Sequence, residues 1–186
     1  MQIYDFDEVD EIVFELKNGR ACIIETDTQL GLICYNGRLI YEIKKRPRSK
    51  KLVTFLPRAN FIQVNNPLYN LLAENFWPGA LTLVINSVSY RIPNNEKLLK
   101  ILSRTGPIYS TSANLHNEQP FVNVLDYQSI EHFQNYDDQL FLVSGKQNSV
   151  MPSTVFNLDS GKILRKGLLF DELCTFLNSH QVKYDF

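Results

Sequence analysis

Short apolar runs typical of strands alternate with segments of helical periodicity, and this alternation most limits the folds that the chain can adopt. Residues 21–26 and 81–86 predict buried strands, whereas residues 7–18 and 95–106 place apolar side chains at helical spacing. Such alternation indicates the α/β class. The chain has 186 residues, of which 44% are hydrophobic, and no linker or internal repeat divides it. We therefore expect one domain over residues 1–186.

The remaining elements follow from the same patterns and from turn and capping residues. Further strands are expected at residues 31–35, 51–56, 87–92, 107–112 and 141–145, and helices at residues 38–45, 66–76 and 122–134. Residues 153–158 and 162–165 predict a hairpin joined by an Asp-Ser-Gly turn, so the sheet should be mixed. The last dozen residues predict a helix and a frayed tail.

The segment KKRPRSKK, residues 44–51, concentrates positive charge on a chain whose formal net charge is only -1. It holds six of the 19 basic side chains, and the other 13 are outnumbered by 20 acidic ones. A protein that coats long nucleic acid usually has a broader basic surface. Focused charge suits a small polyanion better, although a solvated loop and a nucleic-acid contact remain alternatives for this segment alone.

Three other polar segments lie at or between strand ends, where α/β sheets bind ligands. They are TDT at residues 26–28, STSAN at 110–114, and PST with ILR within 152–165. Taken singly, they fit turn residues, a helix cap and a surface arginine. Together with residues 44–51 they offer hydroxyls, backbone N–H groups and cations, which suit phosphate binding. No P-loop, GxGxxG or GxSxG motif is present, so positioning and charge stabilisation should dominate any catalysis.

The cysteines and the N-terminus indicate the compartment. Cys22, Cys34 and Cys174 form no CxxC pair and no metal-ligand spacing with histidine, which predicts free thiols and no structural metal. The acidic N-terminus does not match a signal peptide, and no apolar run approaches the roughly 20 residues that span a bilayer. We expect a cytoplasmic protein that does not associate with membranes.

Six segments, in order, resemble motifs of the YrdC-like family. ETDTQLGL resembles PTDTVYGL, IKKRPRSKKLV the KxRP segment, and WPGALTLVI the sequence WPGPLTLVL. SYRIPNN resembles VRVPDHP, STSAN the SAN segment, and PSTVFNL with ILRKG the sequence STVVD…LRPG. The resemblance covers about residues 21–167 and matches the short form of the family. It implies a YrdC/RibB-like fold, a twisted mixed sheet with flanking helices around a concave basic cavity.

The resemblance also implies a nucleotidyltransferase reaction. ATP, L-threonine and bicarbonate yield threonylcarbamoyl-adenylate and pyrophosphate, with Mg²⁺ brought by ATP and no metal site of the protein's own. A partner complex then uses the intermediate to build N6-threonylcarbamoyladenosine in tRNA. Two alternatives remain: a double-stranded RNA or tRNA-binding module with weak RNA affinity, and a carbamoyltransferase that forms carbamoyl-adenylate. A third alternative is a scaffold with an inactive site, and the retained Lys44, Arg46, Ser112 and Asn114 argue against it.

The family's site residues carry over by motif. The resemblance assigns ATP binding to Lys44, Arg46, Lys50, Ser110, Ser112, Asn114 and Arg165, with Lys44 and Arg46 as the catalytic pair, and threonine binding to Thr26, Arg91 and Ser153. Within residues 44–51, we expect Lys44, Arg46 and Lys50 to point inward and Lys45, Arg48 and Lys51 to be solvated. The chain departs from the family at Glu25, Leu30 and Phe55, which puts the shape of the threonine end in question.

Overall fold

The computed structural model describes residues 1–115, 117–147 and 149–186, and within them the strands form one 10-stranded sheet. The strands are β1 (Gln2–Tyr4), β2 (Ala21–Ile24), β3 (Gly31–Cys34), β4 (Val53–Phe55), β5 (Leu81–Ile85), β6 (Val88–Arg91), β7 (Ile108–Ser112), β8 (Leu140–Val143), β9 (Thr154–Asn157) and β10 (Lys162–Arg165). Their order is β1-β8-β2-β3-β7-β4-β6-β5-β9-β10. Parallel and antiparallel pairs both occur, which confirms the predicted mixed α/β fold.

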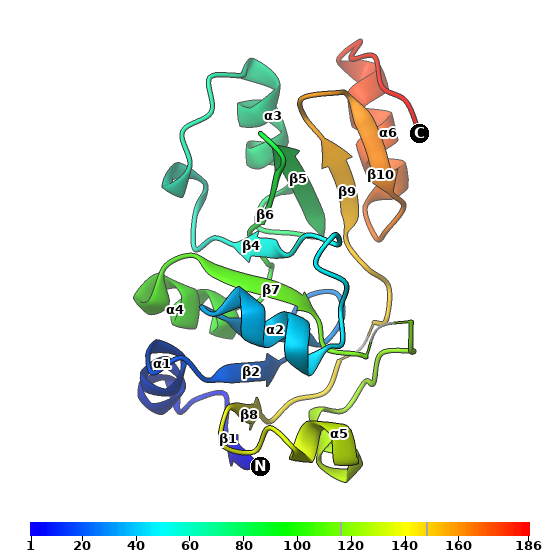
Figure 1. Ribbon diagram of the computed structural model, residues 1–186. Helices are drawn as coiled ribbons and strands as arrows, with labels where there is room; N and C mark the ends of the chain where they lie inside the picture. The colour runs from blue at the N-terminus through cyan, green and yellow to red at the C-terminus, as the bar shows by residue number, and fades with distance from the viewer. Residues whose placement is uncertain (116, 148) are drawn as a thin grey trace.

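The sheet is strongly twisted. In Figure 1, strands β2 and β7 run across the view, whereas β5 and β9 run nearly along its vertical. Strand β4 lies between these two parts, pairing antiparallel with β7 on one side and parallel with β6 on the other. The twist therefore gives the sheet a curved face near β4, β6 and β7, where the polar segments converge.

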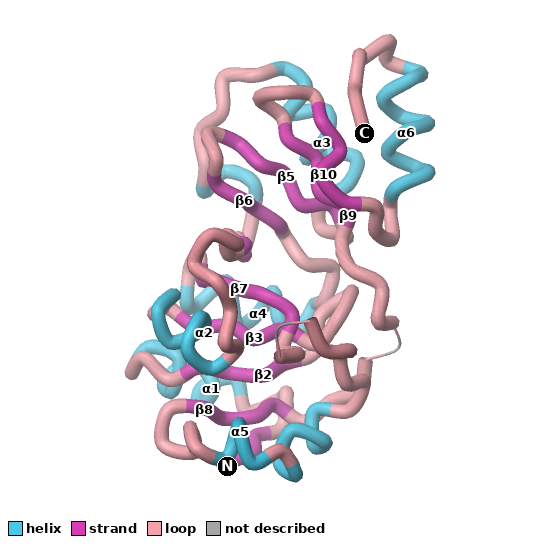
Figure 2. The backbone as a smooth tube through the Cα atoms, turned by 45° about the vertical axis from the view of Figure 1, so that its right-hand side comes forward, coloured by secondary structure: helices cyan, strands magenta, loops and turns pink. Residues whose placement is uncertain are grey.

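Helices cover both parts of the sheet. They are α1 (Val9–Lys17), α2 (Gly37–Ile43), α3 (Pro67–Phe76), α4 (Glu96–Thr105), α5 (Glu131–Gln134) and α6 (Phe170–Ser179), with 3₁₀ turns η1 (Ala59–Phe61) and η2 (Val124–Ser129). Helices α3 and α6 lie beside β5, β9 and β10, and α1, α2, α4 and α5 surround β2, β7 and β8 (Figure 2). Over the described residues, no helix combines the length and apolar character needed to cross a membrane.

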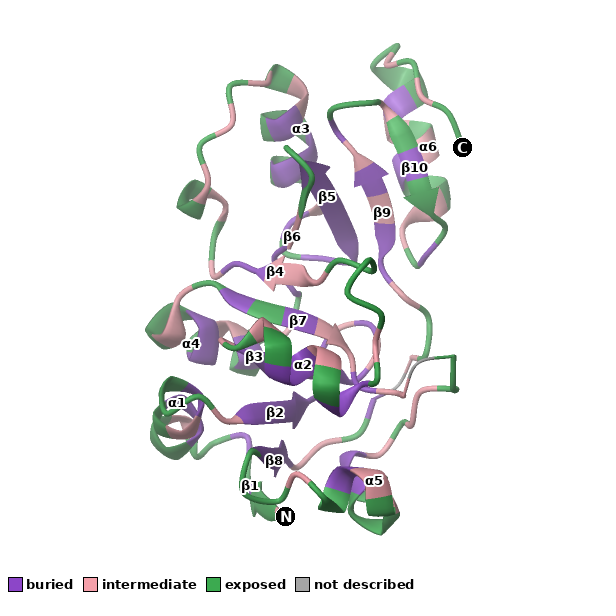
Figure 3. Cartoon of the chain, in the orientation of Figure 1, coloured by how far each residue is buried: buried purple, intermediate pink, exposed green. Residues whose placement is uncertain are grey.

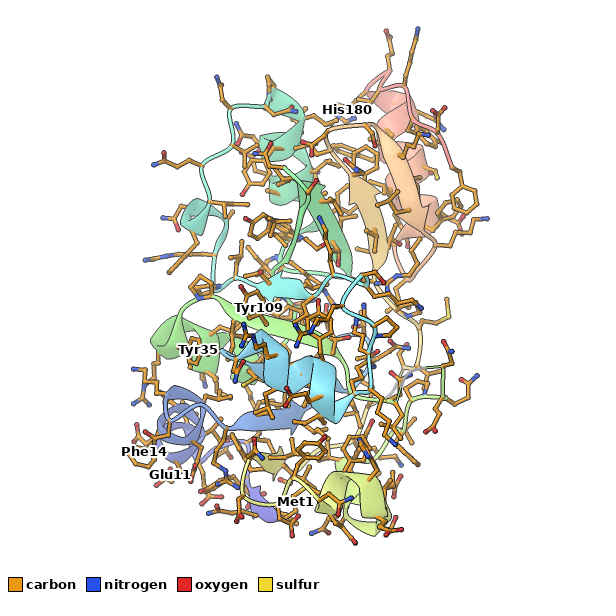
Figure 4. The ribbon with its side chains drawn as sticks, in the orientation of Figure 1. Met1, Glu11, Phe14, Tyr35, Tyr109 and His180 are labelled. Carbon is orange, nitrogen blue, oxygen red and sulfur yellow. The ribbon has the colours of Figure 1, made fainter. Side chains whose placement is uncertain are left out.

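Both faces of β2 are buried, which explains its continuous apolar sequence. Cys22 and Ile24 pack into one core with α1 and α4, whereas Ala21 and Ile23 pack into another with α2 and η2. Figure 3 shows β2 and β8 buried at the centre of this part of the molecule. On α1 the labelled Glu11 and Phe14 lie on the outer, exposed side, away from the sheet (Figure 4).

Local signals fixed several helix ends as predicted. Asn66 and Asn95 accept hydrogen bonds at their Oδ1 atoms from the backbone N–H of Leu68 (2.9 Å) and Leu98 (3.0 Å), which caps α3 and α4. Gly106 closes α4 with a φ of 77°, in a region that favours glycine. These boundaries position the strands that follow each helix.

Three segments differ from the predictions. The helix expected at residues 122–134 is instead η2 and the short α5, broken at Ile130, which has an extended conformation. Val124 and Tyr127 are three residues apart, so the 3₁₀ turn η2 directs both into the core, and Phe133 reaches the same core from α5. The tail is not frayed, because Asp185 exchanges backbone hydrogen bonds with Gly161 and Ile163. Strand β1 was not foreseen, since it is short and lies at the sheet edge.

Candidate functional site

A polar cavity opens on the curved face of the sheet, where strand ends and loops from distant parts of the chain meet. Its lining residues are Thr26, Thr28, Gln29, Gly31, Arg46, Lys51, Val53, Phe55, Thr82, Ser89, Arg91, Ser110, Thr111, Ser112, Pro152, Ser153, Val155 and Arg165. The structure thus brings together seven of the ten residues proposed from sequence. Lys44, Lys50 and Asn114 lie outside the lining.

The cavity is strongly cationic. Arg46, Lys51, Arg91 and Arg165 line it, and its described lining contains no carboxylate. Burial, followed by the neighbouring positive charges of Arg91 and Arg46, lowers the pKa of Arg165. The positive charges of these side chains repel one another, and an anionic ligand would relieve that repulsion. The cavity therefore favours a molecule with several negative charges.

The basic segment reaches the cavity by a turn, not as an extended strand. Lys45 has a φ of 50°, and Lys50 N–H donates to the Pro47 carbonyl, so inward and outward side chains do not alternate. Lys51 lines the cavity and donates to the Ser87 carbonyl at 2.8 Å, whereas the Lys50 side chain is exposed. The expected inward position was therefore wrong for Lys50. Lys51 is exposed, as expected, and also lines the cavity, which was not expected.

Arg46 is fixed at the cavity edge by the same turn. Its Nε donates to the Lys50 carbonyl at 3.0 Å and its Nη2 to the Lys51 carbonyl at 3.1 Å. Burial lowers the pKa of Arg46. These two bonds point the guanidinium at the cavity while leaving other N–H donors available, because a guanidinium carries five.

Lys44 is buried behind the cavity wall and supports the end of β7. Four oxygens lie 2.5–3.1 Å from its Nζ, the carbonyl and Oγ of Ser112 and the carbonyl and Oδ1 of Asn114, and they share its three N–H donors. The Asn114 amide is itself oriented by donating to the Leu115 and Glu118 carbonyls. Lys44 and Asn114 therefore hold the end of β7 and the polar turn that follows it. Ser112, the last residue of β7, lines the cavity.

The charge state of Lys44 gives a testable pH dependence. Burial, followed by the charge of Arg46, lowers its pKa from 10.5 to about 7. The unfolded chain then binds more protons than the folded one between these values, so the free energy of unfolding should rise with pH by up to about 1.4 kcal/mol per unit. Urea titrations between about pH 7.5 and 9 should show this rise. Above that range the raised pKa of the buried Cys22 thiol acts in the opposite direction.

The variant Lys44→Gln isolates this contribution, because it removes the titrating group and keeps two donors. Its unfolding free energy should be nearly flat where that of the wild type rises. Lys50→Gln, on an exposed side chain of the same segment, serves as the control and should follow the wild-type profile. Parallel profiles for wild type and Lys44→Gln would contradict the assignment.

At the other end of the cavity, Arg91 is buried and held on three sides. Its Nε donates to the Gly79 carbonyl (3.0 Å), Nη1 to Thr28 Oγ1 (2.8 Å), and Nη2 forms an ion pair with Asp27. The guanidinium also lies 5.7 Å from the ring centroid of Phe55. Burial lowers the pKa of Arg91, and Asp27 opposes that shift. Each terminal nitrogen keeps a second N–H, enough for a carboxylate fork.

Thr26 shapes the loop between β2 and β3. Its hydroxyl donates to the Gln29 carbonyl at 2.7 Å and accepts from the Thr28 N–H at 3.0 Å. Its backbone N–H donates to Gln147 Oε1 at 3.2 Å. Thr26 lines the cavity, but Thr28 Oγ1 also lies 3.3 Å from its hydroxyl, so the hydrogen-bonding positions of that hydroxyl are used within the loop.

Ser153 and Arg165 meet because β9 and β10 are joined as a hairpin. Arg165 donates from Nε to the Ser153 carbonyl (3.0 Å) and from Nη2 to Ser153 Oγ (2.9 Å). Gly167 allows the following turn to approach, since a Cβ atom there would lie 2.3 Å from the Pro152 oxygen. Arg165, which the resemblance assigns to ATP binding, is thus hydrogen-bonded to Ser153, which it assigns to threonine binding.

The departures from the family pattern occupy different places. Glu25 faces a second hollow, beside Gly145, and does not line the cavity. Leu30 is fully buried in the core beneath α2. Of these three residues only Phe55 borders the cavity, where it lies against Arg91.

Sequence reasoning missed several lining residues. Ser89 precedes Arg91 by two positions and therefore shares its face of β6, a signal that strand alternation offered. Thr82 is a lone hydroxyl in the apolar strand β5. Asp27, within TDT, was also missed; it does not line the cavity but forms the ion pair with Arg91. In the described parts of the chain, no three His, Cys, Asp or Glu side chains gather as metal ligands would.

Comparison with known proteins identifies the same architecture. The family model Sua5_yciO_yrdC, described as telomere recombination, matches residues 15–167. P. abyssi Sua5, crystallised with L-threonine, superposes with a TM-score of 0.83 over 100% of this chain and 63% of its own, at 20% sequence identity. That likeness supports the fold.

Sequence relatives agree with this assignment. An uncharacterized protein of Mycoplasma pneumoniae is 39% identical over 81% of this chain, and the aligned part is 33% of that protein. The threonylcarbamoyl-AMP synthase of Mus musculus is 29% identical over 63% of this chain and 50% of its own length. The chain thus spans only about a third to a half of these relatives. With most of its length matched by the family model, it belongs to the Sua5/YciO/YrdC family.

Proposed function

We propose that this chain is an L-threonylcarbamoyladenylate synthase, which converts ATP, L-threonine and bicarbonate to threonylcarbamoyl-AMP and pyrophosphate. The observation that carries the proposal is the cavity itself, which three arginines and a lysine line without an acidic residue among the described lining. A family that includes threonylcarbamoyl-AMP synthases supports the substrate assignment. We further propose that residues 1–186 act as one catalytic domain.

The proposed ATP site uses the basic turn and the end of β7. Arg46 and Arg165 would contact the phosphates, with Ser110 and Ser112 as hydroxyl partners in the same wall. Lys44 and Asn114 hold that wall, and Lys50 would meet the outer phosphates from the exposed rim. Mg²⁺ would arrive bound to ATP, because the described lining supplies no carboxylate ligand for it.

The proposed threonine site uses Arg91, Thr26 and Ser153. The two remaining N–H groups on the Arg91 terminal nitrogens suit the carboxylate of the amino acid. Thr26 would shape this end by holding the loop that carries Thr28, and Ser153 lies between this end and Arg165. The two substrates would therefore lie side by side, with their reacting groups between Ser153 and the basic turn.

In the proposed reaction, the neutral threonine amine attacks the carbon of bicarbonate, a C–O bond breaks with release of water, and N-carboxythreonine forms. An oxygen of the new carboxylate attacks the α-phosphorus of ATP in line, and the bond from that phosphorus to the bridging oxygen breaks to release pyrophosphate. Arg46 and Arg165 would neutralise charge on the phosphates and the leaving group. Lys44 would act by holding Ser112 in position.

The product would pass to a tRNA-modifying complex that transfers the threonylcarbamoyl group to adenosine, a reaction that we place in the cytoplasm. The exposed lysines and arginine of residues 44–51 could also give weak, salt-sensitive RNA affinity.

Incubating the purified chain with ATP, bicarbonate and L-threonine tests the proposal. We expect a threonylcarbamoyl-adenylate mass together with pyrophosphate, and loss of both when bicarbonate is omitted or serine replaces threonine. Absence of product with all substrates present would contradict the proposal. RNA binding that persists at physiological salt would then favour a binding module, and carbamoyl-adenylate formation would favour a carbamoyltransferase.

A further inference from the structure

Thr82 places a hydroxyl group in the floor of the cavity, within an otherwise apolar strand. It is 1% exposed, and its neighbours in β5 are Leu81 and Leu83. A buried hydroxyl is costly unless it forms a hydrogen bond. The partner that the described residues supply is Ser153, with 2.8 Å between the two Oγ atoms.

Backbone pairing holds this contact in place. Strands β5 and β9 are parallel neighbours, with Leu81 opposite Thr154 and Thr82 opposite Val155. The Thr154 N–H donates to the Ala80 carbonyl at 2.9 Å, which fixes the start of β9 directly after Ser153. The two hydroxyls therefore meet as a consequence of sheet register.

The protons of this cluster can be assigned from its donors. A guanidinium only donates, so Ser153 Oγ accepts the bond from Arg165 Nη2 at 2.9 Å. In either arrangement, one of the two hydroxyls donates to the other, and the second keeps a proton without a protein acceptor among the described residues. Ser153 is the more exposed of the two, at 4% against 1% for Thr82, so the free proton is placed on Ser153, where a ligand can accept it. Thr82 then donates to Ser153, and both acceptor positions of Ser153 are filled.

The geometry points to Thr82 as a positioning residue, which donates to Ser153 so that the Ser153 hydroxyl donates to an anionic oxygen of the ligand beside Arg165. This inference rests on the proposed function for the identity of the ligand. The oxygen belongs either to the threonine carboxylate or carbamate or to an ATP phosphate, which share the same acceptor chemistry.

A double-mutant cycle tests the inference. Thr82→Val removes the hydroxyl at nearly constant volume, Ser153→Ala removes its partner, and Thr82→Ser retains a hydroxyl. Thr54→Val is the matched control, because Thr54 lies in β4 between lining residues Val53 and Phe55 but does not itself line the cavity. Circular dichroism confirms folding of each variant, and calorimetry measures L-threonine and ATP binding separately.

We expect Thr82→Val to weaken binding of one of the two ligands about tenfold, the effect of losing one hydrogen bond of about 1.4 kcal/mol. The same change should have almost no further effect in the Ser153→Ala background. Thr82→Ser should bind like the wild type, as should Thr54→Val. The ligand that responds identifies which oxygen Ser153 meets.

Equal losses from Thr82→Val with and without Ser153 would overturn the inference, as would a Thr82→Ser variant as weak as Thr82→Val. If the wild type forms product but the effects of Thr82→Val and Ser153→Ala are additive, the role of Thr82 is refuted and the proposed function is not. The expected coupling in ligand binding without any adenylate product refutes the proposed reaction alone. A wild-type chain that binds neither ligand refutes both.

Discussion

Replacing Arg46 with alanine is expected to lower the rate of threonylcarbamoyl-adenylate formation by about 10²–10³-fold, the usual loss for removing one preorganised donor at developing charge. The free energy of unfolding should change by less than about 1 kcal/mol. Arg46 is only partly buried, and the carbonyls of Lys50 and Lys51 that it holds lie in exposed residues, where water can replace it.

Steady-state kinetics and urea unfolding measure these two effects on the same preparations. Arg48→Ala is the matched control, since Arg48 belongs to the same turn, is exposed and does not line the cavity. It should turn over at nearly the wild-type rate. An Arg46→Ala variant with near wild-type turnover would refute the role of this arginine, and equal losses in both variants would indicate a diffuse charge effect.

Arg91→Met should have the second large effect: we expect it to lower the free energy of unfolding and to raise the KM for L-threonine. It leaves the Asp27 carboxylate without its ion-pair partner in a site where the Asp27 side chain is only 11% exposed. Breaking such a pair from one side costs about 3–5 kcal/mol of unfolding free energy. The KM for L-threonine should rise strongly, because the proposed carboxylate fork is lost, while the KM for ATP should change less.

The double variant Arg91→Met with Asp27→Asn separates the two effects. Removing the orphaned charge should restore part of the unfolding free energy, since an amide is cheaper to bury than an unpaired carboxylate. It should leave the KM for L-threonine as high as in Arg91→Met. If threonine saturation recovered with stability, Arg91 would be a structural residue and the proposed threonine site would be wrong.

Much of the fold could be predicted from local chemistry. Asn66 and Asn95 cap their helices through their own side chains, and the apolar runs of β2 and β5 are buried as expected. The prediction of one helix over residues 122–134 was wrong. The spacing of its apolar residues fits both an α-helix and a 3₁₀ turn, and local periodicity could not distinguish these two structures.

The site was predictable in part. The motifs identified the segments that converge, and Arg46, Arg91, Ser153 and Arg165 do line one cavity. Motif position did not reveal the contact of Thr82 with Ser153, which depends on the pairing of β5 with β9. Nor did it reveal the ion pair of Asp27 with Arg91, which joins residues 64 positions apart.

The sequence by itself determined the α/β class, most element boundaries and the concentration of positive charge in residues 44–51. Only the tertiary structure decided how those charges are used: Lys44 is buried under the end of β7, and of the exposed Lys50 and Lys51 it is Lys51 that lines the cavity. The physical reason is that the role of a charge depends on its partners. For Lys44 those partners are the oxygens of Ser112 and Asn114, which lie 68 and 70 residues away and meet it only in the folded chain.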